Sequence, residues 1–212
     1  MKHGQDLFDI TSSILLSMKE VYIKHQPDLV LVHGDTTTAF ASSLASFYLN
    51  IPVGHVEAGL RTNNILSPFP EEFNRQIITK ISHYDFAPTD ASGNNLIADS
   101  KNKNNVFISG NTVIDALFWI INKIKSDDQL KNSIVKHLST QLNFDWQHNK
   151  YVLITGHRRE NFGQGFQNIC DAIASLAKRY SDIHFIYPVH LNPNVQKPVK
   201  DKLNDLSNIH LI

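Results

Sequence analysis

The feature that most constrains the fold is a repeated alternation between short apolar runs and segments with helical spacing. Leu29–Val32 is one continuous apolar run, and Pro52–Val56 follows it after a stretch rich in small residues. Continuous runs of this length are typical of strands buried on both faces, whereas apolar residues three or four positions apart are typical of helices. The alternation predicts an α/β fold with parallel sheets.

The same pattern continues along the chain and gives its expected organisation. Helices are predicted over residues 5–24, 39–48, 70–82, 90–96, 112–124 and 165–180. Strands are predicted over residues 29–32, 52–56, 84–87, 106–108, 151–155, 183–187 and 209–212. Residues 126–150 are polar and are interpreted as a connection into a second module.

Two domains follow from this organisation. We expect a first domain over residues 1–111, and an interdomain helix, a connection and the first part of a second domain over residues 112–212. The chain opens on a helix without a preceding strand, and it stops at Ile212 inside an apparent strand. Two complete doubly wound domains need on the order of 300 residues or more. The abrupt ends therefore predict a fragment that lacks part of both domains.

Composition narrows the classes of partner. The chain has 20 Lys and Arg residues and 20 Asp and Glu residues, so no overall charge draws it to nucleic acid or to an anionic membrane. Its one cysteine, Cys170, excludes an internal disulfide, fits a reducing compartment and is expected to be buried in a helix. The first residues lack the apolar region of a signal peptide, and no apolar run approaches the roughly 18 residues of a membrane span. We expect a soluble cytoplasmic protein.

Two acids follow the first two predicted strands. Asp35 and Glu57 each stand just past the carboxyl end of a strand, and neighbouring parallel strands lie about 5 Å apart. The two carboxylates can therefore share one cleft, which suits general acid–base chemistry. Alternatively, Asp35 caps the following helix and Glu57 pairs with Arg61 on the surface.

The predicted strand over residues 151–155 ends in a cationic turn. Gly156 is followed by His157, Arg158 and Glu160, and then by a helix. A helix N-terminus with glycines before it suits an anionic group such as a diphosphate, and ligands bind at this edge of open α/β sheets. The alternative is a surface turn with an Arg–Glu pair. No zinc-ligand spacing, Walker loop or complete dinucleotide fingerprint accompanies it.

Six blocks of the chain together resemble one known family, the non-hydrolysing UDP-N-acetylglucosamine 2-epimerases. In chain order, the blocks are Val32–Thr38, Pro52–Arg61, Ser67–Glu72, Gly110–Asp115, Thr155–Phe162 and Tyr187–Asn194. Such a set is far more specific than any single motif. The family's N-terminal strand with its Gly-Thr-Arg-Pro-Glu turn is absent from this chain, as is the later Ser-Gly-Gly segment that holds the diphosphate.

The resemblance implies two Rossmann-like domains that face a cleft, as in GT-B glycosyltransferases. It implies interconversion of UDP-GlcNAc and UDP-ManNAc through elimination of UDP and a 2-acetamidoglucal intermediate, without a metal or a redox cofactor. The product would supply ManNAc for cell-surface polysaccharide, and the complete enzyme would be a homodimer.

The resemblance also carries residue roles to this sequence. The family's catalytic acids fall on Asp35, Glu57 and Glu71, and its active-site histidine falls on His157. Asp35, Glu57 and His157 would also bind the substrate. Positions that hold a second, activating UDP-GlcNAc in the family fall on three further residues, Arg158, Glu160 and His190.

Other functions are compatible with these motifs. A GT-B glycosyltransferase would share the fold and the nucleotide sugar but would require an acceptor sugar. A hydrolysing epimerase would release free ManNAc and UDP. A truncated, inactive remnant would retain the motifs and show no turnover.

Overall fold

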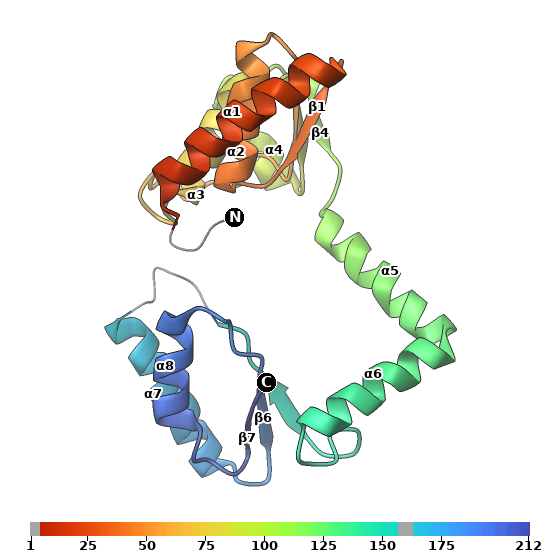
Figure 1. The fold of residues 1–212 in the computed structure, drawn as a ribbon, viewed down its shortest axis with the longest axis vertical. Coiled ribbons are helices and arrows are strands. Elements are labelled where there is room, and N and C mark those ends of the chain that lie inside the picture. The colour runs from red at the N-terminus through yellow and green to blue at the C-terminus, as the bar shows by residue number, and fades with distance from the viewer. Residues whose placement is uncertain (1–4, 157–162) are drawn as a thin grey trace. The chain divides into compact units, whose positions relative to one another are not determined.

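The computed structural model describes residues 5–156 and 163–212, and Figure 1 shows its helices and strands. The chain divides into two compact units, the first ending at Trp119 and the second beginning at Ile120. Each unit is built on its own parallel sheet, as the apolar runs predict. Among the described residues, no helix is long and apolar enough to cross a membrane.

The first unit contains a four-stranded sheet in the order β1-β2-β3-β4, with every neighbouring pair parallel. Its strands are β1 Val30–His33, β2 Val53–Val56, β3 Tyr84–Ala87 and β4 Val106–Ile108. In the register of the sheet, His33 lies opposite Val56, and Val56 lies opposite Phe86. The carboxyl ends of β1, β2 and β3 therefore reach one edge, where the turns after β1 and β2 carry the predicted acids.

Helices connect these strands and lead out of the unit. They are α1 Leu7–His25, α2 Thr37–Tyr48, α3 Glu71–Ile81, α4 Asp90–Ala98, the short 3₁₀ helix η1 Lys103–Asn105, and α5 Thr112–Ser126. Small side chains let α2 pack against both α1 and α3, because Ala41, Ser43 and Ala45 are almost completely buried. The apolar core joins α2 and α3 to the sheet through residues that include Val32, Val53 and Ile78.

The second unit contains a three-stranded parallel sheet in the order β5-β6-β7. Its elements are α6 Asp128–Gln141, β5 Tyr151–Leu153, α7 Gln164–Arg179, β6 His184–Tyr187, α8 Pro193–Leu203 and β7 Ile209–Leu211. Its core contains Phe166, Tyr187 and Leu203, and Cys170 is fully buried there as expected. Burial raises the pKa of the Cys170 thiol, which keeps it in the unreactive protonated form.

Residues 126–150, which were interpreted as a connection, contain a helix that was not predicted, α6 Asp128–Gln141. The Asp127 carboxylate caps this helix by accepting a hydrogen bond from the Leu130 backbone N–H at 2.9 Å. Leu130, Ile134 and Leu138 recur at intervals of four, which is helical spacing. The polar residues between them belong to a helix surface rather than to a loop.

Candidate active site

The turn after β1 is shaped by Gly34 and places Asp35 at the sheet edge. Gly34 adopts a φ of 70°, in the left-handed region that glycine occupies at least cost. Its backbone N–H donates to the Val56 carbonyl at 2.9 Å, so the turn remains attached to β2. A Cβ atom on Gly34 would lie 3.5 Å from Glu57 Oε2. The Glu57 carboxylate therefore lies directly beside the turn that carries Asp35.

Glu57 follows β2 with a φ of 65°, a conformation that non-glycine residues rarely adopt. Such conformations cluster at functional sites, where the surrounding structure holds the strain. The Glu57 carboxylate lies 3.2 Å from Nε2 of His33, and its side chain is 29% exposed. The suggested pair between Glu57 and Arg61 is wrong, because the Arg61 guanidinium donates instead to Asp99 at 2.7 Å. Glu57 therefore remains accessible to a ligand beside one imidazole.

Asp35 does not cap α2, so the suggested capping role is also wrong. Thr36 is the N-cap residue, and its hydroxyl oxygen accepts a hydrogen bond from the Ala39 N–H at 3.2 Å. The Asp35 carboxylate instead forms an ion pair with Arg75, and its main-chain carbonyl accepts a hydrogen bond from Asn74 Nδ2 at 2.9 Å. Both partners belong to α3, so this helix holds both the backbone and the side chain of Asp35.

The two glutamates at the start of α3 have different surroundings. Glu71 is the first residue of the helix and is partly exposed, and within the described part of the chain its carboxylate has no hydrogen bond or ion pair. Glu72 is completely buried and accepts a hydrogen bond from Arg75 at 3.2 Å. Glu71 therefore stands on the helix that contacts Asp35, with its own carboxylate left for a ligand.

Buried side chains on β2 and β3 support the turn after β1. His55 is completely buried, and its Nε2 lies 2.8 Å from the Gly34 carbonyl. Because a carbonyl can only accept, this nitrogen donates the hydrogen bond. Burial lowers the pKa of His55, so the ring is neutral. On the neighbouring strand β3, Asp85 lies opposite His55. Its Oδ2 lies 3.1 Å from Nζ of Lys101 and forms an ion pair with it, but the two atoms are not aligned for a hydrogen bond.

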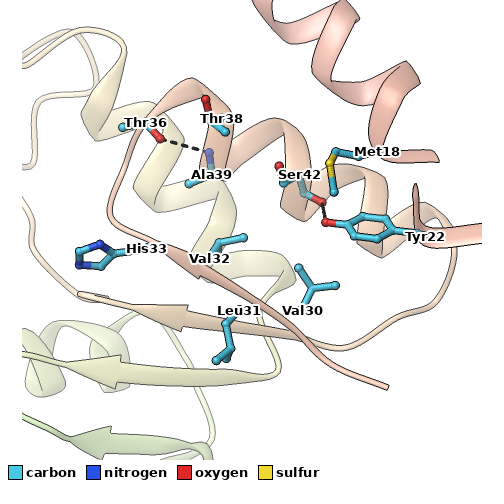
Figure 2. Close-up of a pocket in the computed structure, with 10 residues that line it drawn as sticks. All are labelled: Met18, Tyr22, Val30, Leu31, Val32, His33, Thr36, Thr38, Ala39 and Ser42. Atoms are coloured by element: carbon cyan, nitrogen blue, oxygen red, sulfur yellow. Dashed lines mark hydrogen bonds between the residues drawn. The ribbon is translucent and has the colours of Figure 1, made fainter. Parts of the chain in front are cut away.

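A cavity of about 340 Å³ runs along β1, which has no strand on its other side among the described residues (Figure 2). In Figure 2, Val30 and Val32 point toward the side of the strand that carries Tyr22, and Leu31 points away from it. The Tyr22 hydroxyl donates to the Ser42 carbonyl at 3.3 Å. The cavity extends to His33 and Thr36, so it meets the candidate site at the carboxyl end of β1.

The remaining predicted residues belong to the second unit. His157, Arg158 and Glu160 lie outside the described residues. Immediately before them, the carbonyl of Gly156 accepts a hydrogen bond from the buried Tyr187 hydroxyl at 2.7 Å. His190 is exposed, and its Nδ1 accepts a hydrogen bond from the Asn192 backbone N–H at 3.1 Å. Their predicted roles stay predictions.

Sequence reasoning missed the α3 residues that contact Asp35. Asn74 and Arg75 lie about forty positions further along the chain, and only the packing of α3 against the sheet edge brings them to Asp35. One local signal was available. Glu72 and Arg75 are three positions apart on the predicted helix, which is a favourable spacing for an ion pair.

Comparison with known proteins identifies the relatives of this chain. A family model described as UDP-N-acetylglucosamine 2-epimerase matches residues 1–212. The chain is 53% identical to a UDP-N-acetylglucosamine 2-epimerase from Campylobacter jejuni and 48% identical to one from Escherichia coli K12. All 212 residues align in both cases and span 55% of the length of each relative.

Solved structures agree with the sequence comparison. A Neisseria meningitidis UDP-GlcNAc 2-epimerase, solved with UDP-GlcNAc bound, superposes on the whole chain with a TM-score of 0.93 at 49% identity, and 56% of its chain is covered. A Methanocaldococcus jannaschii UDP-GlcNAc 2-epimerase, solved in complex with UDP-GlcNAc and UDP, gives a TM-score of 0.83 at 31% identity. That match covers 99% of this chain and 56% of the other.

These matches extend over the full length of the chain and over both of its sheets. The fold is α/β with parallel sheets, and its structural neighbours are GT-B-like UDP-GlcNAc 2-epimerases. The chain spans about half the length of these relatives. The chain belongs to the UDP-N-acetylglucosamine 2-epimerase family.

Proposed function

We propose that the whole protein interconverts UDP-GlcNAc and UDP-ManNAc. The observation that carries this proposal is the placement of the Glu57 carboxylate beside the turn of Asp35, at the edge where parallel strands end. Family membership supplies the substrate, because two relatives were solved with UDP-GlcNAc bound. Acids at this edge supply the acid–base groups that epimerisation needs.

The proposed reaction begins with removal of the proton on C2 of the sugar by one of the carboxylates of Asp35, Glu57 and Glu71. The electron pair of the C2–H bond forms a C1–C2 double bond, and the bond between C1 and the diphosphate oxygen breaks. The products are 2-acetamidoglucal and UDP, which stay bound. Return of a proton to the opposite face of C2, with addition of UDP at C1, gives the epimer.

His157 is proposed to contact the diphosphate of UDP. It follows β5 and precedes α7 in the sequence, and a helix N-terminus favours an anion. Arg158, Glu160 and His190 are proposed to bind a second, activating UDP-GlcNAc. We further propose that the whole protein works as a homodimer in the cytoplasm, where its single cysteine stays reduced and nucleotide sugars are available.

The reaction is tested by running it in D2O with UDP-GlcNAc, without added metal or nicotinamide, and following the sugar by NMR. The elimination mechanism exchanges the C2 proton with solvent, so deuterium at C2 is expected in both epimers. A product pool with hydrogen retained at C2 would contradict it. Release of free ManNAc, in place of UDP-ManNAc, would identify a hydrolysing enzyme.

A further inference from the structure

A completely buried carboxylate lies beside the candidate site and has no part in the proposed chemistry. Glu72 is the second residue of α3, and its side chain has 0% exposure. Its Oε1 accepts a hydrogen bond from Gln76 Nε2 at 2.8 Å, and its Oε2 accepts one from Arg75 Nη1 at 3.2 Å. Both oxygens are thus used inside the protein, so Glu72 cannot bind a ligand without losing a partner.

Arg75 connects this buried acid to Asp35. Its Nη1 donates to Glu72, its Nη2 donates to Asp35 Oδ2, and its side chain is only 12% exposed. The guanidinium is planar and rigid, so fixing one nitrogen restricts where the other can lie. Glu72 therefore determines the direction from which Arg75 approaches the Asp35 carboxylate.

A purely stabilising role accounts poorly for this arrangement. Burying an ion pair costs desolvation that often exceeds the Coulombic gain, and an apolar pair of the same volume is frequently as stable. The helix dipole alone would be satisfied by Glu71, which is adjacent and partly exposed. What an apolar pair cannot supply is a fixed cation against Asp35.

We propose that Glu72 is a positioning residue for the reaction: it orients Arg75, which in turn holds the Asp35 carboxylate in its working position. The proposal rests on the proposed function, in which Asp35 is one of the acid–base groups. It divides the adjacent glutamates into two roles, with Glu71 facing the ligand and Glu72 facing the protein.

The first test needs no turnover and uses the 212-residue chain. In the unaltered chain, NMR of the Arg75 side chain should show separate Nη resonances, because two carboxylates restrict rotation of the guanidinium. In Glu72→Gln the charge is lost at nearly constant volume, and these resonances should merge. The Arg75→Lys variant assigns the signals. Separate resonances that persist in Glu72→Gln would overturn the proposal.

The second test measures turnover of the whole protein. Small displacements of reacting groups cost roughly 100-fold in rate. Glu72→Gln should therefore lower kcat by about 10- to 100-fold while the KM for UDP-GlcNAc changes by less than about 3-fold. Glu72→Asp, which keeps the charge, should recover part of the loss.

Asp99→Asn is the matched control, because it removes the carboxylate from a separate Arg–carboxylate pair of the first unit, the one that Arg61 forms with Asp99. It should lower the unfolding midpoint and leave kcat unchanged. Equal losses of kcat in Glu72→Gln and Asp99→Asn would reduce Glu72 to a stabilising residue. If the unaltered whole protein does not epimerise, the proposed function fails, and the NMR comparison still decides whether Glu72 orients Arg75.

Discussion

Three carboxylates carry the proposed chemistry, and each can be tested by an isosteric amide. Asp35→Asn, Glu57→Gln and Glu71→Gln should each lower kcat of the whole protein by roughly 10²- to 10⁴-fold, the usual contribution of an acid–base group. Glu57 and Glu71 are partly exposed, so the unfolding midpoints of their variants should change little. Steady-state kinetics and thermal unfolding of the same preparations give both values.

Glu20→Gln provides the control, because Glu20 is exposed on α1 and outside the site. Its kcat should equal that of the unaltered protein. A variant whose activity falls only in proportion to its loss of folded protein would show that its acid is structural.

The sequence predicted those residues of the candidate site whose position follows from the strand directly before them. Asp35 and Glu57 were identified because they follow continuous apolar runs, and parallel strands place such residues at one edge. Their partners were not predicted correctly. The capping role fell to Thr36, Arg61 paired with Asp99, and Arg75 reached Asp35 from α3. Each partner is set by three-dimensional packing, which local spacing does not encode.

At the level of elements, the strands were predicted more reliably than the helices of the second unit. All seven strand predictions are confirmed with small differences in their ends, because apolar runs rich in β-branched and aromatic residues are local signals. No helix was predicted where α8 lies, and Pro198 inside it argues locally against a helix. Pro193 occupies the first helical position, where no N–H is needed, and packing of Val195, Val199 and Leu203 compensates for Pro198.

The β6–β7 pair contains a feature that predicts a pH dependence. His184 Nδ1 lies 2.9 Å from His210 Nε2, so one ring donates and the other accepts. The Phe144 ring stacks on His184 with centroids 3.8 Å apart. Burial, and then the neighbouring His184, lower the pKa of His210 from its ordinary value of 6.5. Two protonated rings would lose the hydrogen bond and repel each other.

The sign of the effect follows from proton binding. Because the pKa of His210 is lower in the folded protein, the unfolded chain binds the proton more readily, and stability falls as the pH drops below about 6.5. Amides of β6 and β7 should therefore exchange faster with D2O, after correction for intrinsic rates, at about pH 5 than at about pH 7.5. His210→Gln should reduce this difference. An equal pH dependence in the variant would assign it to groups other than His210.

At the scale of the whole molecule, the two units have separate hydrophobic cores. The largest cluster contains Phe166, Tyr187 and Leu203 and lies entirely after residue 119, whereas the clusters around Ile78 and Leu96 lie entirely before it. A domain with its own core can in principle fold alone. The proposed site acids all belong to the first unit, and the proposed diphosphate and activator residues belong to the second. Each unit therefore has its own source of stability, whereas the proposed function needs residues from both units.

Separate cores predict separate responses to core substitutions. Leu203→Ala and Leu96→Ala each remove a completely buried side chain, which typically costs about 2–5 kcal/mol of unfolding free energy. Leu203→Ala should lower the protection of β5–β7 amides against hydrogen exchange and leave that of β1–β4 unchanged, and Leu96→Ala should do the reverse. Exchange measured at low denaturant on the 212-residue chain gives both values in one experiment. If either substitution lowers protection in both sheets equally, the chain unfolds as one cooperative unit, and the division at Trp119 has no thermodynamic meaning.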